Sequence, residues 1–91
     1  MAIQILSSPP PEPEEVVAQL ERAIREALPE ATHIAVRAAS PGHFEIEVVD
    51  AGFEGLSRVR QQQRVYAAIQ PLMAGDAAPV HAIDRMQTRS R

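Results

Sequence analysis

The side chains best suited to chemistry are three histidines, His33, His43 and His81, in a chain of 91 residues without cysteine. Imidazole nitrogens bind transition metals, but a chain without cysteine offers no thiolate ligand, no disulfide and no thiol nucleophile. No two histidines have the short spacing that presents a ligand pair on one helix or turn. His33 falls on the polar side of a predicted strand and is interpreted as a surface residue. Taken alone, His81 fits a half-buried histidine at the start of a strand.

A second group of polar side chains lies within one predicted helix. Arginine and glutamine can read guanine and adenine edges in the major groove, but they also form solvated surfaces and protein contacts. Residues 57–91 hold six Arg and two Asp, a charge of +4, although the whole chain carries −3. Three arginines on one helix give only weak affinity for phosphates. The candidates for nucleic-acid or partner binding are Arg58, Arg60, Gln61, Gln62, Gln63 and Arg64.

From the sequence we predict that this protein is not an enzyme. Asp50, Glu54 and Asp84 have no identifiable base or nucleophile as a partner. Residues 52–55, Gly-Phe-Glu-Gly, have the GxxG form of a nucleic-acid-binding loop. However, they follow a strand, and Glu54 would repel a phosphate. They are interpreted as a tight loop in which glycine permits positive φ and Phe53 packs into the core.

The first half of the domain follows from hydrophobic periodicity. Residues 14–28 form a predicted amphipathic helix that begins after Pro13, ends at Pro29 and buries Val17, Leu20, Ile24 and Leu28. Alternation over residues 32–38 and 43–50 predicts an antiparallel hairpin with a turn at 39–42.

The second half is predicted as helix, short helix and strand. Ser57 can cap a helix over residues 58–70 with Val59, Tyr66 and Ile69 as its buried stripe and Val65 or Gln62 at the edge of that stripe. Pro71 is expected to close or kink this helix, and Leu72 and Met73 to start a short further turn. Residues 80–86 form the third strand, and residues 87–91 are expected to fray. The predicted class is α+β, a two-layer domain with a three-stranded sheet.

Composition and length set the domain limits. Apolar residues make up 45% of the chain, as in a globular domain. We predict a Pro-rich flexible leader over residues 1–13, one domain over 14–88 and a frayed tail over 89–91. No long apolar run and no basic start is present, so the expectation is a cytoplasmic protein without a membrane segment or signal peptide.

Three motifs in order resemble the BolA family. They are His43-Phe44 with the loop Phe53-Glu54-Gly55-Leu56-Ser57, then the helix segment that ends in Val65-Tyr66, then Val80-His81-Ala82-Ile83. The glutamines at 61–63 replace the Arg-His-Arg of many members and resemble the acid-stress branch. Residues 84–86 hold one residue more than the usual strand, which suggests a bulge. The final helix that commonly follows is expected to be absent.

The resemblance implies an αββααβ fold related to the class II KH fold, as a monomer or weak homodimer. It implies an adaptor that binds a monothiol CGFS-type glutaredoxin, with a [2Fe–2S] cluster only in the complex with glutaredoxin and glutathione. His81 would then be a cluster ligand. The alternative implied role is a DNA-binding transcriptional regulator of stress or morphology genes.

His43 has two interpretations. The family's second ligand lies in the loop before this strand, but residues 37–42 contain neither Cys nor His. His43 is the nearest candidate ligand, although this position is usually structural.

Overall fold

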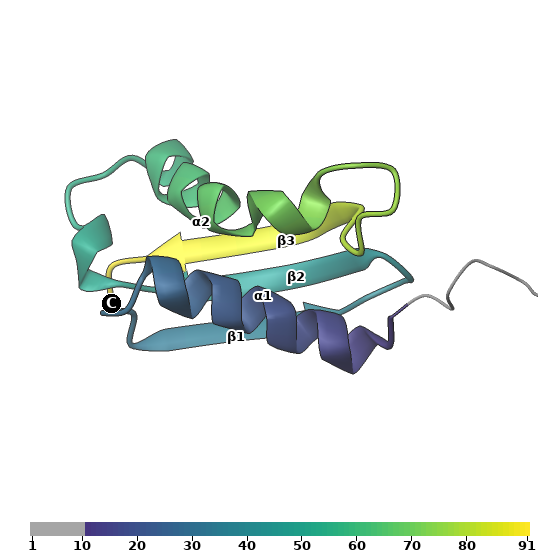
Figure 1. Cartoon of the computed structure of the whole chain (residues 1–91). Helices are drawn as coiled ribbons and strands as arrows, with labels where there is room; N and C mark the ends of the chain where they lie inside the picture. The colour runs from purple at the N-terminus through teal and green to yellow at the C-terminus, as the bar shows by residue number, and fades with distance from the viewer. Residues whose placement is uncertain (1–10) are drawn as a thin grey trace, which may run out of the picture.

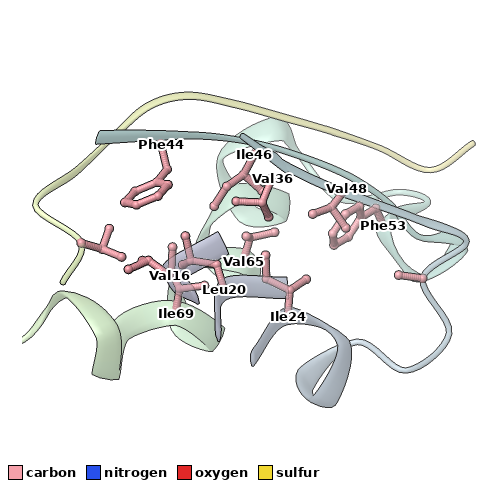
Figure 2. Packing of buried hydrophobic residues seen from close by; sticks show 12 residues of the cluster. Val16, Leu20, Ile24, Val36, Phe44, Ile46, Val48, Phe53, Val65 and Ile69 are labelled. Carbon is pink, nitrogen blue, oxygen red and sulfur yellow. The ribbon is translucent and has the colours of Figure 1, made fainter. Parts of the chain in front are cut away.

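The chain forms two layers, a three-stranded sheet and two helices that cover one of its faces (Figures 1 and 2). The computed structural model describes residues 11–91, so most of the predicted leader lies outside the described residues. The elements are α1 (Pro13–Ala27), β1 (His33–Ala38), β2 (His43–Val49), the 3-10 helix η1 (Ala51–Phe53), α2 (Arg58–Met73) and β3 (Ala82–Arg89). The predicted α+β class is confirmed, and no helix follows β3 among these residues. Neither helix in this range is long and apolar enough to cross a membrane.

Helix α1 starts where proline and acidic residues favour a start. Pro13 occupies its first turn, and the Glu15 carboxylate accepts the backbone N–H of Glu12 at 3.1 Å. Its buried line is Val16, Leu20 and Ile24, so Val16 takes the place predicted for Val17. Because both adjacent residues are valines, periodicity alone could not decide which one faces the sheet.

Strand β2 lies in the centre of the sheet. It pairs antiparallel with β1 and parallel with β3. Its alternate residues Phe44, Ile46 and Val48 are buried, as the pattern predicted, and face the helices (Figure 2). The core between the layers also contains Val36, Phe53, Val65, Ile69 and Val80.

Strand β3 contains the predicted bulge and is longer than predicted. Ile83 pairs with Phe44 and Arg85 with Glu45, which leaves Asp84 as the extra residue. The strand begins at Ala82 and continues to Arg89, so its predicted end at residue 86 and the fraying predicted for residues 87–89 are wrong. The backbone N–H of Asp50 donates to the carbonyl of Arg89 at 3.1 Å. The sequence pattern did not predict this extension, because residues 87–89 are polar and one face of the strand is open to solvent.

Helix α2 departs from its prediction in three ways. It continues through Pro71 to Met73, because a proline in the last turn removes only one hydrogen bond and the residues after it pack on the core. The expected short helix after it is therefore wrong, and the short helical element is η1, before α2. The buried residues are Val65 and Ile69, whereas Val59 is 63% and Tyr66 is 38% exposed. The predicted stripe through Val59 and Tyr66 is wrong.

Candidate functional site

His81 lies between a buried anchor and the first residue of β3. Val80 is buried, and its N–H donates to the carbonyl of Leu72 at 3.1 Å. The His81 N–H donates to the carbonyl of Gly42 at 2.8 Å, so the backbone is held on both sides. The side chain itself is exposed rather than half-buried. This arrangement presents an imidazole on a fixed backbone.

Gly42 makes room for that imidazole. Its φ is +79°, which favours glycine, and a Cβ placed on it would lie 2.8 Å from Nδ1 of His81. The β1–β2 turn therefore approaches the ring more closely than any other residue type permits. The turn and the segment that precedes β3 lie at the same end of the sheet (Figure 1).

His43 begins β2 at this same end. Its Nδ1 lies 2.7 Å from Oδ1 of Asp84, the extra residue of the bulge. Both side chains are about two-fifths exposed, 40% for His43 and 42% for Asp84. An ionised carboxylate only accepts hydrogen bonds, so an ionised Asp84 would require the proton of this contact to lie on Nδ1. The contact joins residues 41 positions apart, which periodicity could not predict.

His33 does not join these two histidines. It pairs with Val49 in the register, at the opposite end of the hairpin, and its Nε2 lies 3.2 Å from Oε1 of Glu47. His33 is exposed, which confirms its interpretation as a surface residue. Among residues 11–91, no group of three or more His, Cys, Asp or Glu side chains is arranged to bind a metal.

His43 and His81 lie at the same end of the sheet. As ligands, they suit a cluster shared with a partner protein better than a cluster held by this chain alone. His43 pairs with Ala82 in the register, so it lies one position from His81 along the strands. The chain has no thiolate to offer, whereas histidine can replace cysteine on one iron of a [2Fe–2S] cluster. The two imidazoles fit part of such a ligand set, with the remaining ligands supplied from outside the chain.

The six candidates on α2 divide into two groups. Arg58, Arg60, Gln63 and Arg64 are exposed. Gln61 and Gln62 are half-buried and donate from Nε2 to the carbonyls of Leu56 at 2.9 Å and Met86 at 3.0 Å. These two amides fasten α2 to the preceding loop and to β3. Four exposed side chains remain for an outside partner.

The loop after β2 is structural in its observed contacts. Asp50 is buried, and its Oδ1 accepts the N–H of Gly52 at 2.7 Å. Phe53 is buried, and Gly55 has a φ of +81°. The interpretation as a tight loop that packs Phe53 into the core is confirmed.

The open face of the sheet carries an ion-pair network that the sequence analysis missed. Glu47 accepts from Arg89 at 2.7 Å and approaches His33, while Arg37 pairs with Glu45 across the hairpin. Hydrogen bonds from Arg89 and then His33 lower the pKa of the Glu47 carboxyl below its ordinary value of 4.5. Glu45 and Glu47, at alternate positions of β2, were the available signal in the sequence.

Comparison with known proteins agrees with this fold. The family model described as BolA-like protein matches residues 19–90. BolA-like protein 1 of Bos taurus is 36% identical over 80 residues, which cover 75% of this chain and 57% of the relative, so the chain spans less than two thirds of its length.

Solved structures show the same architecture. BolA1 from Arabidopsis thaliana superposes with a TM-score of 0.66 at 19% identity, over 81% of this chain and 89% of that one. BolA1 from Mus musculus gives a TM-score of 0.64 at 26% identity, over 98% of this chain and 75% of that one. The match over most of the chain, together with the two-helix, three-stranded architecture, shows that this chain belongs to the BolA-like protein family.

Proposed function

We propose that this chain is a cytoplasmic adaptor that binds a monothiol CGFS-type glutaredoxin and shares a [2Fe–2S] cluster with it in iron homeostasis or stress response. The observation that carries the proposal is His81, an exposed imidazole on a backbone held by Gly42 and by the buried Val80. It occupies the Val-His-Ala-Ile motif by which the chain resembles its family.

The chain's contribution to such a complex is imidazole nitrogen alone. His81 would bind iron, and His43 is the second candidate at the same end of the sheet. The glutaredoxin cysteine and glutathione would supply the thiolates. Imidazole ligation of one iron raises the reduction potential of the bound cluster relative to all-thiolate ligation. The exposed Arg60 and Arg64 on α2 would flank the protein contact.

The test is reconstitution with a monothiol glutaredoxin, glutathione, iron and sulfide. Visible absorption and circular dichroism are recorded for the parent chain and for His81→Ala, with His33→Ala as the matched histidine control. We expect a new spectrum from the mixture, lost in His81→Ala and kept in His33→Ala. The chain alone should stay colourless. If the partner's own homodimer spectrum persists unchanged in the mixture, the adaptor proposal is wrong.

DNA binding is a second candidate, favoured by the composition of α2. The helix has three arginines and no acidic residue, and none of the three forms an ion pair within residues 11–91. Each phosphate contact adds about −0.9 to the slope of log K against log salt, so three contacts give about −3. Fluorescence anisotropy with duplex DNA tests this for the parent and Arg60→Ala/Arg64→Ala. A flat salt dependence would exclude it.

A further inference from the structure

We propose that Asp84 is a positioning residue for His43, and that it makes His43 the second iron ligand by fixing the ring with Nε2 free. The inference rests on the proposed cluster-sharing function and deepens it. The observation is the 2.7 Å contact between His43 Nδ1 and Asp84 Oδ1, next to the fixed His81.

The bulge is what brings Asp84 to the histidine. In an unbroken register, the residue after Ile83 would stand opposite Glu45, which would place one carboxylate against another. The bulge instead places Arg85 opposite Glu45 and leaves Asp84 outside the ladder. Bulges commonly re-aim a side chain, and here the re-aimed side chain is hydrogen-bonded to His43.

The hydrogen bond selects one form of the neutral ring. The Asp84 carboxylate accepts a hydrogen bond from Nδ1–H, so the lone pair of the neutral imidazole lies on Nε2. Nε2 of His43 has no hydrogen bond to any group of residues 11–91. A histidine that ligates a metal almost always donates its other ring N–H to a carboxylate, a carbonyl or water. His43 with Asp84 is such a pair, and binding through Nε2 releases no proton from the ring.

The position of the pair suits a ligand that completes its coordination with a partner. Both side chains are about two-fifths exposed, so a docked protein can reach the ring. An ion pair this exposed adds little to the stability of the fold. Its relevance therefore lies in how it orients the His43 ring. The bulge, the carboxylate and the free Nε2 occur together at the one sheet end that also holds His81.

The first arm of the test uses the chain alone. Long-range ¹H–¹⁵N spectra of the histidine rings report which nitrogen carries the proton in the neutral form. We expect His43 with the proton on Nδ1 in the parent chain, and loss of that preference in Asp84→Ala. Asp84→Asn keeps an acceptor oxygen at this position and does not shorten the bulge. This variant should retain part of the preference for the proton on Nδ1. Asp76→Ala, in the loop before β3, is the matched control and should match the parent. A parent ring protonated on Nε2 would overturn the proposal.

The second arm uses the complex with glutaredoxin and glutathione. We expect His43→Ala and Asp84→Ala to alter the circular dichroism of the mixed cluster. Asp84→Ala should also weaken the binding of the cluster by about 10–100-fold, as loss of a ligand's hydrogen-bonding partner does. A cluster lost in His81→Ala but unchanged in both other variants overturns this inference and leaves the adaptor role intact. Failure of the parent to form any mixed cluster overturns both.

Discussion

The two faces of β2 differ in almost every physical respect. On one face Phe44, Ile46 and Val48 are buried under α1 and α2 (Figure 2). On the other, His43 and Glu45 form exposed polar pairs with residues of the neighbouring strands. The difference shows that alternate side chains of one strand have different roles. One set of side chains forms the core, whereas His43, Glu45 and Glu47 between them form polar pairs on the open face of the sheet.

The largest expected effect comes from the buried face. Phe44→Ala should lower the free energy of unfolding by roughly 3–5 kcal/mol, because it removes buried apolar surface and leaves a cavity. The adjacent His43→Ala, on the open face, should change it by less than ~1 kcal/mol. Urea unfolding followed by circular dichroism measures both. Equal losses from the two variants would contradict the division between the faces.

The next effect comes from the turn that meets His81. Gly42→Ala should cost about 1–3 kcal/mol, because alanine is strained at positive φ and its Cβ would meet the ring. Gly75→Ala is the matched control, since its φ is +89° but nothing lies within 4 Å of the added Cβ. The excess loss in Gly42→Ala measures the contact with His81. Similar losses would show that the ring moves away freely.

A smaller effect should distinguish neighbouring glutamines on α2. Gln62→Ala removes the hydrogen bond to the Met86 carbonyl and should cost about 0.5–1.5 kcal/mol. Gln63→Ala, on an exposed neighbour, should leave the urea midpoint near that of the parent. If Gln63→Ala were the more damaging variant, the proposed fastening of α2 to β3 would be wrong.

The smallest effect is a pH dependence on the open face. Arg89 and His33 lower the pKa of Glu47 in the folded state, so its ionised form stabilises the fold. This contribution is fully present above the unfolded-state pKa, 4.5, and is lost as pH falls through the lower folded-state pKa. The stability gap between the parent and Glu47→Gln should therefore narrow on acidification. If the difference in the free energy of unfolding stayed constant from neutral to acidic pH, the ionised form of Glu47 would not stabilise the fold.

Local patterns explain which predictions succeeded. Alternation in β2, the proline at the start of α1 and the Ser57 cap are properties of short segments, and all appear in the structure. Each depends on steric or hydrogen-bonding preferences that act within a few residues. The bulge at Asp84 is also present, but it was expected from the family resemblance, in which this strand has one residue fewer.

Helix α2 shows that local patterns do not always predict which side of a helix is buried. Two helical lines of apolar residues were available, and the structure buries Val65 and Ile69 while Val59 remains exposed. The bonds of Gln61 and Gln62 to the preceding loop and to β3 hold this rotation of the helix. Periodicity within the helix contains no information about those partners.

The sequence by itself determined the order of the two long helices and three strands, the two-layer class and the absence of a thiolate ligand, because these depend on local pattern and composition. Tertiary structure alone decided that β3 continues to Arg89 and that Asp84 meets His43. Those outcomes depend on which strands lie side by side, and the His43 contact joins residues 41 positions apart. Contacts at such separation follow from the packing of the whole chain and leave no periodic trace in either segment.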